Sequence, residues 1–316
     1  MTHGVPMKKI IFSLVAGLLL CAGVCAQNIR LGVLNGPSCI PAAYLLDESV
    51  EKFADPQALL PKMLKGEIDI GFMPANVAAK VYNSSNGAIQ VLAITGNGNL
   101  SLITTDTSVK SLADLKGKTV AVAGQAATPD YMFRYLLEKN GIAVDTADGV
   151  TLDFSIPTAQ IAAQLISGKI DYAVVPEPFA TVAQIKSDKV FVAVDLQAEY
   201  EKFAGAGKVY PLTVMVVTKA FAKKNAKVIK AFLADYQASL AKTLENPMEA
   251  GKLCEDFGLG LQAAIVAKSV PKANYVYIPA GTSDAKKNIE ELLNIFLACD
   301  ETSIGGKLPD KNFYYK

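Results

Sequence analysis

One carboxylate lies where it could bind a ligand rather than simply face water. Glu177 stands between Pro176 and Pro178, directly after a short apolar run that is typical of a buried strand. An acidic side chain at such a position is costly unless it is exposed or has a partner. If Glu177 faces a cleft, its oxygens would accept hydrogen bonds from an amine-bearing molecule and would repel a sulfonate. The alternative interpretation is an ordinary carboxylate on a solvated loop.

The groups that most enzymes use for catalysis are scarce in this chain. Its single histidine, His3, lies in the N-terminal segment, and its cysteines form no paired motif. A zinc or redox site is therefore not expected, and the commonest general base for hydrolysis is missing. The sequence has no Gly-x-Ser-x-Gly elbow, no phosphate-binding loop and no Gly-x-Gly-x-x-Gly pattern for a dinucleotide. We expect a protein with no metal, no cofactor and no enzymatic activity.

The N-terminus carries the pattern of a secretory signal peptide. A short basic region precedes the apolar run Ile10–Leu20, and small residues follow up to Ala26. The apolar run is shorter than the about 20 residues that span a membrane comfortably. We expect residues 1–26 to be a signal peptide that is cleaved off, and the protein to be periplasmic or secreted. Lipid anchoring through Cys25 is the less favoured alternative.

Charge and composition exclude several classes of protein. The chain has 31 basic and 30 acidic residues, and loss of the signal segment changes this balance little. A near-neutral chain offers no electrostatic footprint for nucleic acid or for an anionic membrane surface. Its 316 residues are enough for two domains with cores, and an apolar content of 51% argues against disorder. Cys39, Cys254 and Cys299 remain after cleavage, and a Cys254–Cys299 disulfide stays open.

Two segments that begin 102 residues apart share nearly the same pattern. Leu64–Pro74 and Ile166–Pro176 each read as a helix end, a glycine, an Ile-Asp entry, an apolar strand and a proline-led loop. Glycine suits the left-handed position past a helix C-terminus, and the apolar run suits a parallel strand buried on both faces. A second pair of strands, starting at Asn28 and Lys118, runs into glycine-containing loops that precede helices. The sequence therefore predicts two similar α/β lobes with a cleft between them.

The order of strand and helix signals suggests that one lobe is inserted into the other. We expect lobe 1 to comprise residues 27–107 and 209–316, including C-terminal helices, and lobe 2 to comprise residues 108–208. Each lobe should hold a mixed, mostly parallel sheet flanked by helices. Segments near Thr104–Ser108 and Lys208–Pro211 would then form a hinge. Helix N-termini facing the cleft could hold polar or anionic groups with free backbone N–H groups.

Several of these features occur together and in a characteristic order. They are the signal peptide, the two Gly-x-Ile-Asp strands, the entry to lobe 2 at Lys116–Val122, and the Pro-Glu-Pro segment. In this order they resemble a bacterial solute-binding protein of an ABC importer. The branch in question includes binding proteins for nitrate, sulfonates, taurine and thiamine-precursor pyrimidines. The resemblance implies a type II periplasmic-binding-protein fold, a small-molecule ligand, and an ABC permease and ATPase as partners. We also expect a monomer, and the charge balance predicts no binding to nucleic acid.

The same resemblance implies where a ligand would sit. In that family the ligand lies between the lobes, held by the loop after the first strand of each lobe and by the loops after the Ile-Asp strands. Carried onto this sequence, the implied ligand-binding residues are Asn35, Gly36, Pro37, Ser38, Cys39, Ala75, Asn76, Gly124, Gln125, Ala126, Thr128, Glu177 and Tyr210. Asn76 and Thr128 are also expected to cap helices.

Two classes of ligand stay open. Arg30 on the first strand and Arg134 inside a helix are not well placed as a bidentate clamp for an anion. Helix N-termini could still hold an oxyanion such as nitrate or a sulfonate. Glu177 and the Asn and Gln side chains instead suit a small neutral or amine-bearing molecule. A heterocycle stacked on Tyr131 or Tyr210 is slightly preferred.

Besides transport, two other classes of function stay open, an enzyme of the same fold and a binding protein that serves a sensor. Some proteins of this fold are cytoplasmic enzymes of menaquinone biosynthesis, and related pyrimidine synthases use a His and a Cys-rich segment. The secretion signal argues against the first, and the missing His and Cys cluster argues against the second. A binding protein that serves a membrane sensor is the third reading, and adjacent genes for a permease and an ATPase would decide between sensing and transport.

Overall fold

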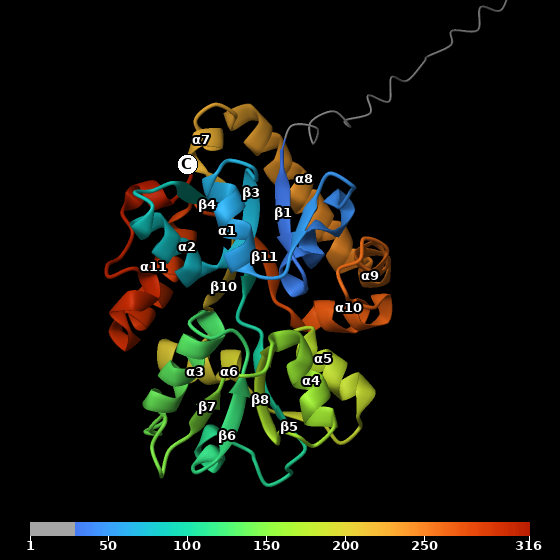
Figure 1. The fold of residues 1–316 in the computed structure, drawn as a ribbon, viewed down its shortest axis with the longest axis vertical. Helices are drawn as coiled ribbons and strands as arrows, with labels where there is room; N and C mark the ends of the chain where they lie inside the picture. The colour runs from blue at the N-terminus through green and yellow to red at the C-terminus, as the bar shows by residue number, and fades with distance from the viewer. Residues whose placement is uncertain (1–28) are drawn as a thin grey trace, which may run out of the picture.

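The computed structural model describes residues 29–316, which form two lobes, each built on one β-sheet (Figure 1). The expected signal segment 1–26 lies outside the described residues. The expected α/β fold, with two mixed sheets flanked by helices, is confirmed. The sheets are not mostly parallel as expected, because four strand pairs are parallel and five are antiparallel. We call the lobe that contains β1 lobe 1, which is the upper lobe in Figure 1, and the other one lobe 2.

The sheet of lobe 1 has six strands in the order β11-β4-β10-β3-β1-β2. The strands β1, β2 and β3 pair in parallel, whereas β10 pairs antiparallel with β3 and β4, and β11 antiparallel with β4. The strands are β1 Leu31–Leu34, β2 Glu51–Phe53, β3 Ile70–Pro74, β4 Ile89–Asn97, β10 Pro211–Thr218 and β11 Tyr275–Pro279. The α-helices are α1 Pro56–Leu64, α2 Ala75–Ser84, α7 Lys219–Ala222, α8 Ala226–Glu245, α9 Pro247–Asp256, α10 Ala263–Ser269 and α11 Ser283–Cys299. Short 3-10 helices are η2 Pro37–Leu45, η4 Val270–Lys272, η5 Glu301–Ile304 and η6 Lys311–Phe313.

The sheet of lobe 2 has five strands in the order β7-β6-β8-β5-β9. The strands β6, β7 and β8 pair in parallel, and β5 pairs antiparallel with β8 and β9. The strands are β5 Leu100–Thr104, β6 Thr119–Val122, β7 Thr151–Asp153, β8 Tyr172–Pro176 and β9 Phe191–Asp195. The helices are η3 Leu112–Leu115, α3 Thr128–Lys139, α4 Thr158–Ile166, α5 Phe179–Lys186 and α6 Leu196–Ala204.

The repeated sequence pattern forms the same turn in both lobes. Gly66 follows α1 with φ 73°, and Gly168 follows α4 with φ 71°, which is the left-handed conformation that glycine adopts without strain. In each turn the next backbone N–H reaches back to a helix carbonyl, at 2.8 Å from Glu67 and at 3.0 Å from Lys169. The turns lead into β3 and β8, each beside a parallel strand. The loops that follow β1, β3, β6 and β8 carry most of the residues expected at a ligand site.

The chain crosses between the lobes twice. It leaves lobe 1 between β4 and β5 and returns between α6 and β10, and the Gly98 N–H donates to the Tyr210 carbonyl at 2.9 Å to join the two crossings. β5 pairs with β8 and therefore belongs to lobe 2. The first crossing thus lies near Gly98, before the boundary at Ser108 that the sequence suggested.

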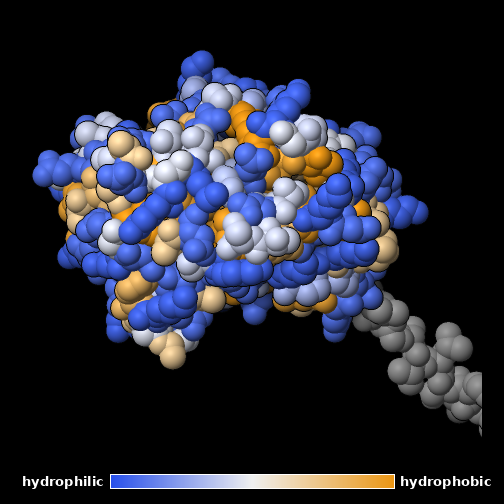
Figure 2. Space-filling view, turned by 90° about the horizontal axis from the view of Figure 1, so that it is seen from below, coloured by the Kyte–Doolittle hydropathy of each residue, from blue (hydrophilic) through white to orange (hydrophobic). Residues whose placement is uncertain are grey.

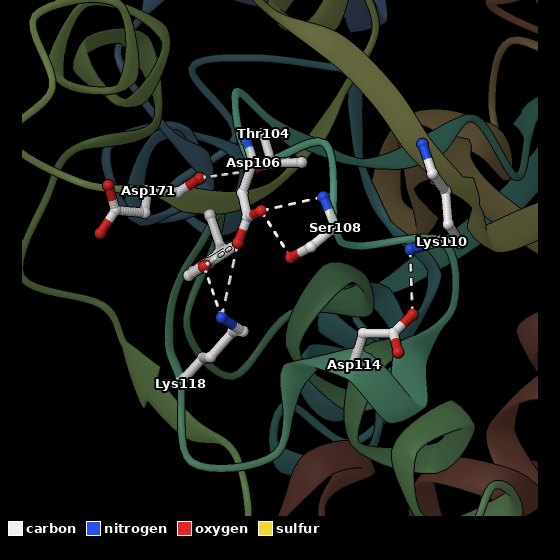
Figure 3. Close-up of polar contacts among 8 residues, drawn as sticks. Thr104, Asp106, Ser108, Lys110, Asp114, Lys118 and Asp171 are labelled. Atoms are coloured by element: carbon white, nitrogen blue, oxygen red, sulfur yellow. Dashed lines mark hydrogen bonds and ion pairs between the residues drawn. The ribbon is translucent and has the colours of Figure 1, made fainter.

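The expected hinge segment Thr104–Ser108 lies instead in a polar cluster of lobe 2 (Figure 3). The Asp106 carboxylate accepts hydrogen bonds from the backbone N–H and hydroxyl of Ser108 at 3.0 and 2.6 Å. It also accepts from the Tyr172 hydroxyl at 2.6 Å, and the Lys118 ammonium contacts the same hydroxyl at 2.7 Å. These contacts tie the end of β5 to the starts of β6 and β8. The expectation of a hinge at this segment is therefore wrong.

The cysteines do not pair among the described residues. Cys39 and Cys254 are buried, Cys299 is exposed, and all three thiols are free. The Cys254–Cys299 disulfide that the sequence left open is not formed.

The surface offers little continuous apolar area at the end of the molecule that lobe 2 forms. Figure 2 shows this end as mostly hydrophilic, with hydrophobic areas that are small and separated. Within residues 29–316, no helix combines the length and the apolar character that crossing a membrane requires.

Candidate functional site

The loop after β1 lies against lobe 2, as its expected role requires. Gly36 has φ 113°, and a Cβ atom placed on it would lie 3.9 Å from the Phe179 ring at the start of α5. Asn35 is exposed, whereas the Pro37 carbonyl accepts a hydrogen bond from the Tyr275 hydroxyl at 2.9 Å. The loop is therefore fixed to lobe 1 while one side of it faces α5.

Two further residues of this loop point inward. The Ser38 hydroxyl is buried and has no hydrogen-bond partner within the described chain. The buried Cys39 thiol donates to the carbonyls of Leu34 and Gly36, each at 3.3 Å, and burial raises its pKa. Because a buried, protonated thiol is unreactive, Cys39 supports the loop rather than performing chemistry.

The loops after β3 and β6 touch each other across the lobes. The side-chain amide of Asn76 donates to the Ala126 carbonyl at 3.0 Å and, more weakly, to the Ser303 carbonyl at 3.4 Å. Its side-chain oxygen accepts from the Thr128 hydroxyl at 3.4 Å. Neither Asn76 nor Thr128 caps a helix as expected, because Pro74 and Ala127 occupy those positions. Both side chains are buried and are used for contact between the lobes.

The rest of the loop after β6 is exposed but rigidly held. Gly124, Gln125 and Ala126 are solvent-exposed, and both Gly124 (φ 68°) and Ala126 (φ 56°) have left-handed backbone. The Ala126 N–H donates at 2.8 Å to the buried Asp130 carboxylate on α3. This carboxylate holds the strained Ala126 in place and leaves the Gln125 side chain free to reach a ligand. Ala75, by contrast, is fully buried at the start of α2.

Glu177 is buried at the point where β8 ends. Its side chain is 4% exposed, and one carboxylate oxygen accepts from the Thr181 N–H at 3.2 Å. Burial raises the pKa of the Glu177 carboxyl, and the contacts with Thr181 and the charge of Lys272 offset this in part. The hydroxyl of Thr181 is itself buried without a partner within residues 29–316. A carboxylate with one hydrogen bond and few neighbours of opposite charge can still accept donors from a ligand.

A cavity of about 380 Å³ includes Glu177 and lies beside the crossings. Its volume falls in the range of small-molecule sites. Residues of both lobes line it, and they are Gly98, Asn99, Ser101, Glu177, Gln184, Val192, Asp195, Lys272 and Asn274. Apart from Gly98 and Val192, all of these residues have polar or charged side chains. Among them, the sequence singled out Glu177 alone.

The missed residues carry little sequence signal. Asn99 belongs to a Gly-Asn-Gly-Asn run, which predicts a turn. In the structure this run forms the first crossing between the lobes. Lys272 comes from η4 of lobe 1, far along the chain, and its ammonium lies 3.4 Å from the Gln184 amide oxygen on α5. Such a meeting depends on the packing of α10 against α5 and could not be inferred from spacing.

Neither arginine is available as an anion clamp. Arg30 binds Asp69 through two hydrogen bonds, from Nε at 2.9 Å and from Nη2 at 2.5 Å. Arg134 donates to Asp130 at 2.7 Å and lies 3.5 Å from Asp145. Both guanidinium groups are therefore neutralised by carboxylates of their own lobe.

Neither tyrosine offers an open face for stacking. The Tyr210 ring is fully buried in the crossing, where a Cβ atom on Gly98 would lie 2.4 Å from it. The Tyr131 ring is 6% exposed and packs on Phe296 with ring centroids 5.4 Å apart. The expected stacking of a heterocycle on Tyr131 or Tyr210 is therefore wrong, because protein atoms already cover both rings.

A larger groove, of about 770 Å³, lies wholly on lobe 1. It is lined by residues of α8, α9 and α10 and of the segments between them, and shares no residue with the expected site. Among residues 29–316, no three His, Cys, Asp or Glu side chains gather in a way that could hold a metal ion.

Comparison with known proteins places the chain in a sequence family. A sequence model of the NMT1-like family matches residues 40–255. No curated protein matches the sequence.

Solved structures of similar fold cover nearly the whole chain. One is an ABC transporter from Parabacteroides distasonis, 26% identical, with a TM-score of 0.76 over 91% of this chain and 98% of that one. The periplasmic aliphatic sulphonate binding protein of Escherichia coli is 15% identical, with a TM-score of 0.67 over 89% and 92%. The periplasmic nitrate-binding protein of Synechocystis is 13% identical, with a TM-score of 0.60 over 90% and 91%. The two-lobed fold expected from the sequence is the fold of these proteins.

Proposed function

Since the chain belongs to the NMT1-like family and shares its fold with periplasmic binding proteins, we propose that it is the solute-binding protein of an ABC importer. It captures a small molecule between its lobes and delivers the molecule to a permease, whose transport an ATPase drives. It acts as a monomer in the periplasm, after removal of residues 1–26. Hinge closure around a ligand is the usual motion of such proteins.

The observation that carries this proposal is the burial of Glu177 between the lobes. A carboxylate with a raised pKa in a polar cavity is a recurrent mark of a functional site. Lobe 2 supplies Glu177 and Gln184, and lobe 1 supplies Lys272. A ligand in this cavity would therefore contact both lobes and stabilise the closed arrangement.

The cavity favours a ligand with N–H donors over an oxyanion. Glu177 accepts hydrogen bonds, and a negative charge beside it would be repelled. Arg30 and Arg134 are engaged elsewhere, so the strongest binders of nitrate and sulfonate groups are missing from the cavity. An amine-bearing molecule, such as an amino-substituted heterocycle, fits these groups best.

Isothermal titration against a panel of aminopyrimidines, flavins, nitrate and alkanesulfonates tests the proposal. We expect one nitrogen-bearing compound to bind and to raise the melting temperature, because binding to the folded state alone stabilises it. Glu177→Gln should lower its affinity roughly tenfold to hundredfold, since a charge-assisted hydrogen bond is lost. Asp188→Asn is the control: it removes an exposed carboxylate of lobe 2 that does not line the cavity, and it should leave the affinity unchanged.

The outcomes separate the alternatives. Binding confined to nitrate or sulfonates would overturn the ligand class and leave the transport role standing. Steady turnover of a compound would overturn the binding role. Mass spectrometry of the exported protein tests the location, and we expect a chain that begins at Gln27.

A further inference from the structure

The C-terminal segment after α11 is fixed to lobe 1 by several hydrogen bonds. The Asn83 amide on α2 donates to the carbonyls of Ile304 and Lys307, each at 2.7 Å. The Tyr315 N–H donates to the Val91 carbonyl on β4 at 2.9 Å. The segment is therefore part of lobe 1.

The same segment also reaches lobe 2. The Tyr131 hydroxyl on α3 donates to the Asp300 carboxylate at 2.9 Å, and the Tyr131 ring packs on Phe296 of α11. The Asp300 carboxylate also accepts from the Thr302 N–H at 2.8 Å, which fixes its position at the start of η5. Contacts with Thr302 and Tyr131 hold the pKa of Asp300 below its usual value, so it is ionised at neutral pH.

The other polar contacts between side chains of the two lobes are longer. Among residues 29–316, Lys272 meets Gln184 at 3.4 Å, and Asn76 meets Thr128 at 3.4 Å. The Tyr131–Asp300 hydrogen bond is the shortest between side chains of the two lobes, and its acceptor is charged. Hydrogen bonds to charged groups are the stronger ones. Figure 1 shows α11 and α3 at one side of the molecule and α10 and α5 at the other, so this bond lies on the far side from Lys272.

We propose that Tyr131 and Asp300 form a clasp that holds the two lobes closed, with the C-terminal segment as its anchor on lobe 1. The two residues act as positioning residues: they set the fraction of closed molecules and do not touch a ligand. A ligand that needs the closed form binds more weakly when that fraction falls. The clasp concerns the protein by itself, so its failure would leave the proposed transport role untouched.

The chain contains a matched pair that lies within one lobe. The Tyr82 hydroxyl on α2 donates to the Asp310 carboxylate at 2.7 Å, and Asp310 begins η6 just as Asp300 begins η5. Both pairs join a buried tyrosine to an aspartate of the C-terminal segment, but Tyr82 and Asp310 both belong to lobe 1. The Tyr82→Phe variant therefore removes the same kind of hydrogen bond without affecting the contact between the lobes.

Small-angle scattering of the protein without added ligand tests the clasp. Tyr131→Phe keeps the ring packing on Phe296 and removes one hydroxyl, and Asp300→Asn keeps an acceptor for the Thr302 N–H. We expect each to raise the ratio of open to closed molecules roughly threefold to thirtyfold, seen as a larger radius of gyration. The double variant should show little further increase, because both changes weaken the same hydrogen bond.

The Tyr82→Phe variant should leave the radius of gyration unchanged. Hydrogen exchange provides a second readout, and we expect faster exchange at residues 124–128 in the Tyr131 and Asp300 variants alone. An unchanged radius in Tyr131→Phe and Asp300→Asn would overturn the clasp, and so would an equal increase in Tyr82→Phe. If Tyr131→Phe fails to fold by circular dichroism, Asp300→Asn carries the test.

Discussion

The Asn76 side-chain amide and the Ala126 carbonyl lie 3.0 Å apart, although they come from different lobes. Asn76 is 1% exposed, and its side chain also accepts from Thr128 and donates towards Ser303. One buried amide thus joins lobe 1, lobe 2 and the C-terminal segment.

Replacing Asn76 tests how much this junction stabilises the fold. Asn76→Ala should lower the free energy of unfolding by about 1–3 kcal/mol, because it leaves buried polar partners unsatisfied. Asn76→Asp should lower it further at pH 7, since a carboxylate would face the carbonyls of Ala126 and Ser303. Urea denaturation measures both. An Asp variant as stable as the Ala variant would contradict the assigned hydrogen bonds.

Gly98 should tolerate no side chain at the first crossing. A Cβ atom there would lie 2.4 Å from the Tyr210 ring and 2.5 Å from the Gln197 amide oxygen. We expect Gly98→Ala to lower the free energy of unfolding by about 1–3 kcal/mol, the usual effect of overpacking. Gly96 lies two residues earlier, on β4, where an added Cβ would meet no atom closer than 3.9 Å. Gly96→Ala should therefore have a free energy of unfolding near that of the wild type. Thermal and urea unfolding of the two variants compare them directly, and equal losses would refute the steric argument.

Glu177 should make the protein less stable as the pH rises. Burial raises the pKa of this carboxyl in the folded state above its usual 4.5. The folded state therefore holds the proton more tightly than the unfolded state, and the stabilisation is lost as the pH rises through the raised pKa. Glu177→Gln removes this effect. The melting temperature of the variant minus that of the wild type should therefore increase as the pH rises above about 4.5. Melting curves between pH 4 and 8 measure the gain, and a constant difference would show that Glu177 does not titrate there.

Asp106 should have the opposite pH dependence. Hydrogen bonds from Ser108 and Tyr172, helped by the charge of Lys118, hold the pKa of its carboxyl well below the usual range. The stabilisation is present above the unfolded pKa of about 3.9 and disappears as the pH falls through the lowered value. Asp106→Asn should therefore melt at a lower temperature than the wild type at pH 7, and the gap should narrow in acid. A gap as large at pH 2 as at pH 7 would point to packing rather than charge.

Local signals account for the parts of the fold that the sequence predicts. Gly66 and Gly168 end helices because glycine adopts the left-handed conformation, and the apolar runs after them are buried strands. The same reasoning misplaces the hinge. The segment Thr104–Ser108 looks like a connection, but β5 already pairs with β8 before it, and Asp106 fixes it to lobe 2.

The candidate site is predicted in its loops and missed in its cavity. Asn76, Thr128 and Glu177 follow strands that the sequence pattern identifies, and all three lie between the lobes in the structure. Lys272 and Gln184 meet across the cavity because α10 packs on α5, and that packing depends on contacts far apart in the chain. Tyr210 lies in a connecting segment of the sequence, but its ring is buried in the space that the missing side chain of Gly98 leaves.

The way the chain crosses between the lobes predicts an order for folding. Lobe 2 takes all of its strands from the continuous stretch between β5 and β9, whereas the sheet of lobe 1 joins β4 to β10 and β11. Until β10 or β11 pairs with it, β4 has no partner in its own sheet and is an open edge that can pair with the wrong strand. We expect the amides of lobe 2 to become protected first in pulse-labelled refolding. Those of lobe 1 should follow once β10 and β11 pair with β4. Simultaneous protection of both lobes would show that they fold as one unit.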